Sequence, residues 1–363
     1  MSTPDTRVRV GFVGVGTMGQ AAHLRNYASL SEDCEVVACA ELSAPLRKAA
    51  ARRYGIARAY ASGAELLAHE RVDALVAAQP FERHGQIVPE LLAAGVPIFT
   101  EKPIASSVAT GERLVAAVAA SGTWLMVGYH KRCDPATVHA KAAMDGFRQS
   151  GELGRLRYLR LTMPPGDWIA GGFNDVLPET WRRDNAALTL DPPPADMDPA
   201  TCQEYNTFVN YYVHQINLLR HLLGEPYRVS YADPARVLLV AHSASGVPCT
   251  IEMAPYHTSL DWQEMALAGF DRGYVKLSLP APLVHHLPGR VEILRDPGHG
   301  VTPTVTIPHL PPEHAMRAQA RAFLRAVRGE SPAPCLAPEA LEDLRVAREY
   351  IRLLERQKVE GRR

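Results

Sequence analysis

Short apolar runs alternate with amphipathic stretches over the first 130 residues. The runs predict buried strands, and the stretches between them have the spacing of helices with one apolar face. The predicted strands span 8–13, 35–40, 74–78, 96–100 and 124–128, and the predicted helices span 20–30, 45–54, 65–69, 85–94 and 108–120. Strands that alternate with helices predict a parallel sheet covered on both faces.

A different pattern follows, in which two helices precede a series of strand-like runs. The predicted helices span 136–147, 208–223, 313–327 and 338–357, and the predicted strands span 155–163, 228–231, 235–243, 249–254, 264–269, 274–279 and 291–294. The short turns 244–246 and 271–273 suit antiparallel hairpins. Only seven of the 29 prolines precede residue 150, which also separates the two parts. We therefore expect an open, mostly antiparallel sheet with helices on one face.

Composition limits the classes of function. The 363 residues suit two domains, and Lys+Arg and Asp+Glu are both 39, which argues against a nucleic-acid partner. The six cysteines form no CxxC pair and predict free thiols in a reducing cytosol. Residues 1–6 are polar and lead into a strand, and no apolar run approaches about 20 residues, so we expect no signal peptide and no membrane span. Together these features predict a cytoplasmic protein.

A glycine loop follows the first predicted strand. Gly14, Gly16 and Gly19 form a G-x-G-x-x-G, with Thr17 and Met18 inside it and a helix after it. The glycines permit a tight turn, close approach of a pyrophosphate and close helix packing, and the helix N-terminus binds the phosphates. Glu41 ends the second strand, where its carboxylate can accept from both ribose hydroxyls and repel a 2′-phosphate. The loop predicts a dinucleotide site that prefers NAD to NADP, although the arginines after Glu41 keep NADP open.

Glu101, Lys102 and Pro103 directly follow the strand at 96–100. A lysine in such a place can be an ordinary solvated loop charge. Open parallel sheets, however, bind ligands at the carboxyl ends of their strands. Lys102 would there bond a substrate hydroxyl and stabilise the alkoxide that develops as hydride leaves.

At this point the chain resembles the Gfo/Idh/MocA oxidoreductases, the family of glucose–fructose oxidoreductase and inositol dehydrogenase. The resemblance rests on the glycine loop, on Asp73-Ala-Leu-Val-Ala-Ala-Gln-Pro80 with His84, on Glu101-Lys102-Pro103, and on Gly128-Tyr-His-Lys-Arg-Cys-Asp-Pro135. It implies an NAD(P)-dependent dehydrogenase that moves a hydride between the nicotinamide and a secondary alcohol or ketone of a sugar, cyclitol or derivative. It also implies a homodimer or homotetramer.

The resemblance to this family also implies where the domains begin and end and which residues contact the cofactor. It implies a Rossmann NAD(P)-binding domain over 1–128, an α+β domain for substrate binding and oligomerisation over 129–335, and a C-terminal helix over 336–363 that packs back on the first domain. Lys102 matches the catalytic lysine, and His130 falls near the nicotinamide. The residues that the resemblance and the loop together place at the cofactor are Gly14, Gly16, Thr17, Met18, Gly19, Glu41, Gln79, Pro80, His84, Glu101, Lys102 and His130.

A second family signature is a glycine-rich turn followed by Asp-x-x-x-His-x-x-Asp on a helix. The matching segment is Asn210-Tyr-Tyr-Val-His214-Gln-Ile-Asn217, whose spacings of four and three put the polar residues on one helix face. His214 matches the general acid/base, a role that suits an imidazole, although it can also be a surface or core histidine. Both acidic positions are Asn and the preceding glycines are missing. Asn210 can orient the ring of His214 but supplies no charge.

The connection between Met163 and Cys202 is long for a compact domain, and such loops are functional lids or disordered. Trp168 and Trp181 can stack on a sugar ring, and Arg182 or Arg183 can hold an anionic group; the two tryptophans can equally be plain anchors. We expect Trp168, Trp181 and Arg182 to bind substrate together with Lys102, Asn210, His214 and Asn217. The scattered histidines of the proline-rich tail lack metal-site spacing, and we expect no metal.

Two other functions stay open. One is a redox-neutral enzyme that retains NAD and epimerises a sugar or cleaves a glycoside through a transient keto-sugar. The other is a non-catalytic NAD-binding regulator of the same fold. The presence of both Lys102 and His214 favours an enzyme, because a pure sensor has no need for both.

Overall fold

The computed structural model describes residues 7–182 and 188–360 and divides into two compact units. Unit 1 contains residues up to 129, 171–202 and 316–344. Unit 2 contains residues 130–170, 203–315 and those from 345 onward. The polar segment 1–6 and Arg183, which entered the sequence predictions, lie outside the described residues. Compactness does not show which segments fold alone, so the boundaries 128/129 and 335/336 stay predictions.

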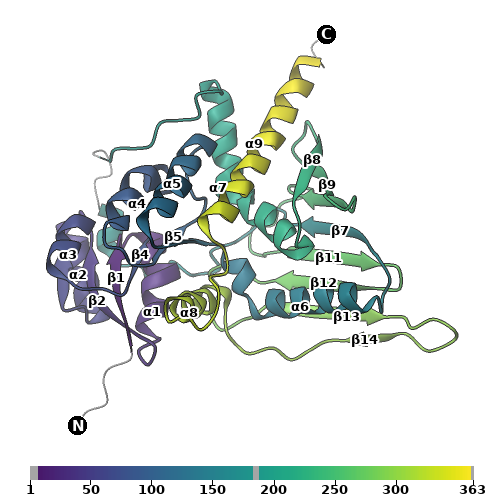
Figure 1. Cartoon of the computed structure of the whole chain (residues 1–363), viewed down its shortest axis with the longest axis horizontal. Coiled ribbons are helices and arrows are strands. Elements are labelled where there is room, and N and C mark those ends of the chain that lie inside the picture. The colour runs from purple at the N-terminus through teal and green to yellow at the C-terminus, as the bar shows by residue number, and fades with distance from the viewer. Residues whose placement is uncertain (1–6, 183–187, 361–363) are drawn as a thin grey trace. The chain divides into compact units, whose positions relative to one another are not determined.

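Unit 1 is built on a parallel six-stranded sheet, as the alternating pattern predicted (Figure 1). The strands are β1 (Val8–Val13), β2 (Cys34–Ala40), β3 (Arg58–Tyr60), β4 (Ala74–Ala77), β5 (Ile98–Glu101) and β6 (Leu125–Gly128), in the order β3-β2-β1-β4-β5-β6. The strand order reverses between β1 and β4, and sheets of this kind bind ligands outside the carboxyl ends of the strands at that point.

The helices of unit 1 follow the strands in turn. They are α1 (Arg25–Ala28), α2 (Ala44–Tyr54), α3 (Gly63–His69), α4 (His84–Leu92) and α5 (Val108–Ser121). The turn before α1 is a π-helix over Gly19–Leu24 whose residues are all buried. The edge strand β3 was missed by the sequence analysis because none of its three residues is fully buried, which leaves no apolar run to detect.

The core of unit 1 includes a helix from the far end of the chain. In α8 (Ala315–Val327), Phe323 is fully buried against the first sheet, with its ring 5.8 Å from that of Phe99 and 5.7 Å from that of Trp124. The first residues of α9 (Ala337–Glu360) pack on α5, where a Cβ built on Gly111 would lie 2.9 Å from Leu341 Cδ1. Segments from the far end of the chain therefore complete the hydrophobic core around the six-stranded sheet.

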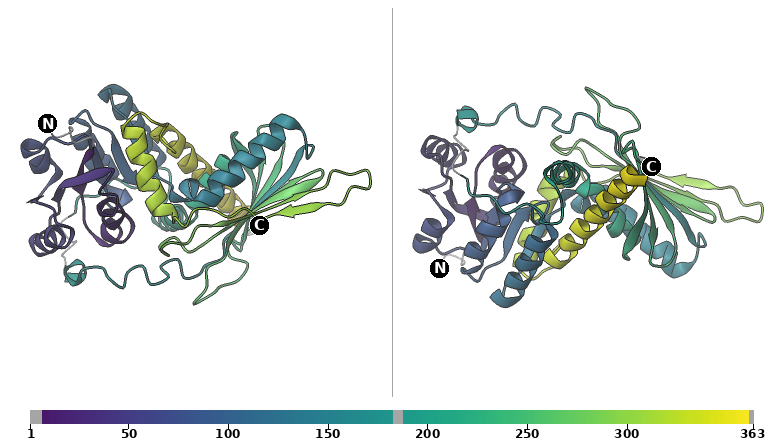
Figure 2. Two further views of the ribbon diagram at one scale, coloured as in Figure 1. Left: turned by 90° about the horizontal axis from the view of Figure 1, so that it is seen from below. Right: turned by 90° about the horizontal axis from the view of Figure 1, so that it is seen from above.

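Unit 2 is built on an eight-stranded sheet in the order β14-β13-β12-β11-β7-β10-β9-β8. The strands are β7 (Leu156–Thr162), β8 (Tyr227–Ala232), β9 (Leu238–Ser243), β10 (Pro248–Glu252), β11 (Glu264–Phe270), β12 (Gly273–Leu279), β13 (Arg290–Arg295) and β14 (Thr304–Thr306). Every pair is antiparallel except β7 with β10, and both predicted hairpins are present. The views agree that α6 (Pro135–Ser150) lies across one face (Figure 2).

The long helix α7 (Pro199–Leu223), whose residues from 203 onward belong to unit 2, begins at Pro199 rather than at the predicted residue 208. Asp198 holds its first turn, because the Asp198 carboxylate accepts from the Thr201 backbone N–H at 2.9 Å. The early turns carry many polar residues and only a weak apolar period, which hid them from the sequence analysis. The helix ends at Gly224, whose φ of 69° is left-handed, as predicted for a glycine stop.

His221 near the end of α7 is expected to make the stability of the fold depend on pH. Burial and the neighbouring cations Arg132, Lys141 and Arg220 lower the pKa of His221 to about 3. The folded chain keeps this ring neutral, whereas the unfolded chain protonates it near pH 6.5, so stability is present above pH 6.5 and is lost as the pH falls toward 3. The loss between pH 6.5 and 4.5 should be about 2 kcal/mol, after a reduction for partial exposure of the ring.

Urea unfolding at both pH values tests this expectation. The variant His221→Gln should lose about 2 kcal/mol less between pH 6.5 and 4.5 than the wild type. His242→Gln, which changes an exposed histidine on β9, is the control and should leave the difference unchanged. Equal losses in wild type and His221→Gln would contradict the assignment.

Candidate active site

The glycine loop packs against the loop that follows β4. Gly14 has a φ of 97°, and a Cβ built on it would lie 2.5 Å from the Ala78 carbonyl oxygen and 2.4 Å from Gln79 Nε2. A Cβ on Gly19 would lie 2.6 Å from the Gly14 carbonyl oxygen. Thr17 then opens the helix, with Thr17 and Met18 both partly exposed. This tight turn at a helix N-terminus fits the phosphates of a dinucleotide.

Glu41 lies beside the glycine loop, as its sequence position predicted. Its Oε2 accepts from the Val15 backbone N–H at 3.2 Å and its Oε1 from the Ser43 N–H at 3.1 Å. The guanidinium of Arg47 donates to the main-chain carbonyl of Glu41 at 2.5 Å. Arg47 therefore binds the main chain just after β2, whereas the Glu41 carboxylate binds backbone N–H groups, including that of Val15 in the glycine loop.

His84 connects the loops that follow β4 and β5. Its ring is fully buried, with Nδ1 3.1 Å from the Ile104 carbonyl and Nε2 3.2 Å from the Gln79 carbonyl and 3.1 Å from Thr100 Oγ1. Burial lowers the pKa of His84, which favours the neutral ring; a neutral ring carries one N–H and donates to only one of these two carbonyls. The Gln79 amide donates to the Val13 carbonyl at 3.1 Å. His84 therefore supports the Gln79–Pro80 loop and the segment after Lys102, and its contact with a cofactor stays a prediction.

Glu101 turns inward rather than toward solvent. Its Oε1 lies 2.5 Å from His23 Nε2, and its Oε2 accepts from the Lys102 N–H at 3.1 Å. Burial acts to raise the pKa of Glu101, but the bond from His23 and the charge of Lys102 hold it below its ordinary value. A charged Glu101 thus fixes the backbone at the start of the Lys102–Pro103 step. The side chain of Lys102 is partly exposed at the carboxyl end of β5.

In unit 2 the structure brings His130 and His214 together. His130 lies in the short helix His130–Cys133, and its ring centroid is 4.8 Å from that of His214 on α7, at an interplanar angle of 72°. Along α7, Asn210 is exposed, His214 is partly exposed, and Asn217 is buried. The Oδ1 of Asn217 accepts from Arg132 Nε at 2.7 Å. The predicted spacing is present, but Asn217 faces Arg132 in the interior.

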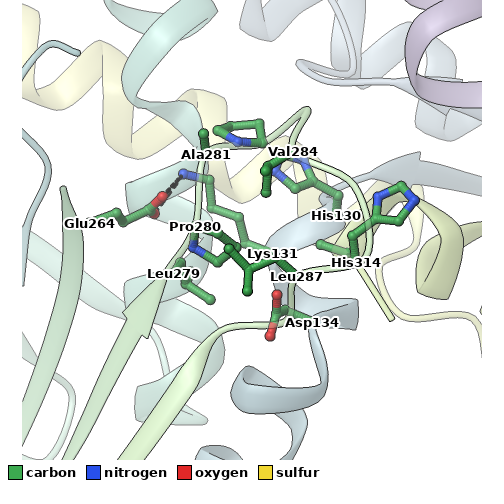
Figure 3. A pocket seen from close by; sticks show the side chains of 12 residues that line it. His130, Lys131, Asp134, Glu264, Leu279, Pro280, Ala281, Val284, Leu287 and His314 are labelled. Atoms are coloured by element: carbon green, nitrogen blue, oxygen red, sulfur yellow. Dashed lines mark hydrogen bonds and ion pairs between the residues drawn. The ribbon is translucent and has the colours of Figure 1, made fainter. Parts of the chain in front are cut away.

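Beside this pair lies a pocket that the sequence analysis did not predict (Figure 3). His130, Lys131 and Asp134 line it together with Glu264 and His314, and the loop between β12 and β13 forms an apolar wall. Lys131 runs toward Glu264, and the two side chains form an ion pair (Figure 3). The sequence offered a hint of Lys131, which follows the predicted site residue His130 in a basic run. Glu264 is the first residue of β11, and no motif in the sequence marks it as a site residue.

The three predicted substrate residues of the long connection belong to different units. The Trp168 carbonyl accepts from the Leu283 N–H at 3.4 Å in unit 2. Trp181 and Arg182 lie in the short helix Pro178–Arg182 of unit 1, where Trp181 is 63% exposed. That helix is held by Gln20, whose Nε2 donates to Thr180 Oγ1 at 2.8 Å and to the Val15 carbonyl at 2.7 Å. Gln20, which the sequence analysis missed, thus links the glycine loop to the short helix Pro178–Arg182.

Comparison with known proteins places this chain. Residues 8–129 match the model of an oxidoreductase family with an NAD-binding Rossmann fold. The chain is 34% identical over 151 residues to inositol 2-dehydrogenase of Acidothermus cellulolyticus. The matched segment covers 41% of this chain and 43% of the relative. It is 29% identical over 286 residues to inositol 2-dehydrogenase 1 of Saccharopolyspora erythraea, covering 76% of each.

A solved structure extends the likeness to the whole fold. The aldose–aldose oxidoreductase of Caulobacter crescentus superimposes with a TM-score of 0.70 at 18% identity, covering 97% of this chain and 98% of the other. Over residues 8–129 the chain is thus similar to the NAD-binding domain of the Gfo/Idh/MocA oxidoreductases. The predicted fold class, a Rossmann domain followed by a second domain with an open, mostly antiparallel sheet, is confirmed.

Two further observations concern what else the chain can bind. Within residues 7–182 and 188–360, every helix is too short or too polar to cross a membrane. Over the same ranges, no three His, Cys, Asp or Glu side chains converge as metal ligands do. The predicted absence of a metal stays a prediction, since the remaining residues are not described.

Proposed function

We propose that this protein is an NAD-dependent dehydrogenase that oxidises a secondary alcohol of a cyclitol of the inositol class, or of a closely related sugar. The observation that carries the proposal is the arrangement at the carboxyl edge of the first sheet. There the Gly14 turn, the Glu41 carboxylate and Lys102 follow β1, β2 and β5 of one parallel sheet. The names of the two inositol 2-dehydrogenase relatives support the substrate class.

Each site residue has a proposed role. The bound nicotinamide would accept the hydride. The ammonium of Lys102 would bond the substrate oxygen and stabilise its developing negative charge. His214 would take the hydroxyl proton, and Asn210, one helical turn earlier, would orient the substrate or the ring. Trp168, Trp181 and Arg182 are proposed substrate contacts; Asn217, which is buried on Arg132, would act through the helix rather than by direct contact.

The Glu41 carboxylate supports NAD over NADP. A 2′-phosphate placed at the end of β2 would meet this negative charge, and Arg47, the nearest arginine in sequence, donates to the backbone carbonyl. We expect kcat/KM with NAD to exceed that with NADP at least about tenfold, a difference of about 1.4 kcal/mol. In Glu41→Ala the ratio should fall, with Glu65→Ala on α3 as the control. A wild-type preference for NADP would contradict this prediction.

A turnover screen tests the proposed function. Purified protein is incubated with NAD or NADP and with myo- and scyllo-inositol, free and phosphorylated sugars, sugar acids and glycosides, and NADH is followed at 340 nm. The expected result is steady NADH formation with at least one cyclitol and little with glycosides. Product formation without NADH accumulation would instead favour a redox-neutral enzyme. Cofactor binding without turnover of any compound would favour the regulator.

We also propose that the protein is a cytoplasmic homodimer or homotetramer. The face of the second sheet opposite α6 carries partly exposed apolar side chains, among them Leu267 on β11 and Leu294 on β13. Such a face is stabilised by burial against a second copy. The six cysteines are all buried and form no disulfide among the described residues, which suits a reducing compartment. Light scattering on the eluting protein measures the oligomeric state.

A further inference from the structure

A lysine and a glutamate form an ion pair in the interior of unit 2, next to the two histidines. Lys131 Nζ lies 2.6 Å from Glu264 Oε1 and 2.5 Å from Oε2, and both side chains are less than 5% exposed. Burial lowers the pKa of Lys131, although Glu264 opposes that shift. Removing two charges from water costs free energy that apolar side chains of the same volume would not cost. Stability alone therefore does not account for the pair.

The Glu264 carboxylate also binds a residue from another element. Gln215 Nε2 on α7 donates to Glu264 Oε1 at 2.7 Å, and Gln215 is fully buried. The Trp262 ring also lies next to the pair, with its centroid 5.5 Å from Lys131 Nζ. Glu264 on β11 thus joins α7 to the short helix His130–Cys133 through two hydrogen-bonded side chains.

Both partners of Glu264 directly follow a histidine in the chain. Lys131 follows His130, Gln215 follows His214, and the two imidazole rings are themselves in edge-to-face contact at 4.8 Å. Consecutive residues of an α-helix project about 100° apart. Anchoring Gln215 therefore sets the rotation of α7 about its own axis, and with it the direction in which His214 projects.

We propose that Glu264 is a positioning residue for the reaction: it binds Lys131 and Gln215 and so fixes the His214 ring against His130. The proposal rests on the function proposed above only in taking His214 as the base. A hydrogen-bonded polar network has few alternative packings, whereas an apolar contact tolerates sliding and rotation. Proton transfer depends steeply on the place of the base, so a small rotation of α7 would lower kcat more than it would weaken substrate binding.

The variant Gln215→Met separates positioning from folding. Methionine has a similar length and volume, removes only the bond to Glu264, and leaves the Lys131–Glu264 pair intact. The matched control is Gln319→Met, which replaces a 1% exposed glutamine on α8 in the other unit. If Gln215→Met does not fold, Gln215→Leu replaces it, because leucine is apolar and fills most of the same volume.

Steady-state kinetics on folded, active-site-titrated enzyme give the first measurement. In Gln215→Met, kcat should fall at least about tenfold while KM changes less than about threefold and the affinity for NADH is unchanged. Gln319→Met should retain the wild-type kcat. A purely structural role would lower the thermal midpoint of Gln215→Met and leave kcat unchanged, and that result would overturn the proposal.

Histidine-labelled protein gives a second measurement that does not depend on turnover. The ring signals of His214 and His130, assigned with His214→Asn and His130→Asn, should shift or broaden in Gln215→Met and stay in place in Gln319→Met. Unchanged ring signals would overturn the proposal whether or not any substrate is turned over. If His214→Asn retains full activity while Gln215→Met moves the His214 ring, then the function proposed for His214 fails and the positioning by Glu264 holds.

Discussion

Lys102→Ala should lower kcat/KM at least about a hundredfold while the affinity for NADH changes less than tenfold. The reason is that Lys102 is proposed to stabilise charge on the substrate oxygen, whereas Gly14 and Glu41, which are proposed to hold the cofactor, follow other strands. A hundredfold loss corresponds to about 2.7 kcal/mol of transition-state stabilisation, the size expected for one preorganised donor. Stopped-flow and steady-state rates with the cyclitol found in the screen, and calorimetry with NADH, measure the two effects.

Two further variants make the Lys102 result specific. Lys102→Met keeps the length of the side chain and should be as inactive as Lys102→Ala, because only the ammonium is lost. Lys141→Ala removes a surface lysine that pairs with Asp145 on α6, and it should leave kcat/KM unchanged. A Lys102→Ala enzyme with a near-normal rate would show that Lys102 is not the catalytic lysine.

Gly14→Ala should weaken NADH binding at least about a hundredfold, or about 2.7 kcal/mol. The alanine would need a φ of 97° and would place its Cβ 2.5 Å from the backbone oxygen of Ala78. The turn must therefore open, and the loop then loses the shape that receives the pyrophosphate. Because the same turn packs on Gln79, its opening also disturbs the Gln79–Pro80 loop.

The control variant Gly95→Ala introduces backbone strain without the steric clash that is expected in Gly14→Ala. Gly95 also has a positive φ, of 68°, but a Cβ built on it meets nothing within 4 Å. It should cost about 1 kcal/mol of stability and leave NADH binding unchanged. Isothermal calorimetry on both variants, with thermal midpoints to confirm folding, measures the difference. Equal affinities in Gly14→Ala and Gly95→Ala would argue against the pyrophosphate at this turn.

The sequence by itself determined the elements whose signal is local. The apolar runs at 8–13 and 96–100 predicted β1 and β5, and the glycine loop predicted the tight turn, because strand burial and positive φ are both visible in residue type. The position of Glu41 beside the loop also followed, since the carboxyl ends of parallel strands lie at one edge of a sheet. By contrast, β3 and the early turns of α7 lack an apolar period and were missed.

Only the tertiary structure decided which side chains meet across the chain. Glu264 lies 133 residues from Lys131 and 49 from Gln215, and a strand residue in that place has no pattern to distinguish it. The same holds for Gln20, which reaches Thr180 from 160 residues away, and for the His130–His214 contact. Residue type and spacing encode local conformation and the face of an element, whereas pairings between distant elements depend on how their faces pack. Those pairings place His214, and no local pattern in the sequence contains them.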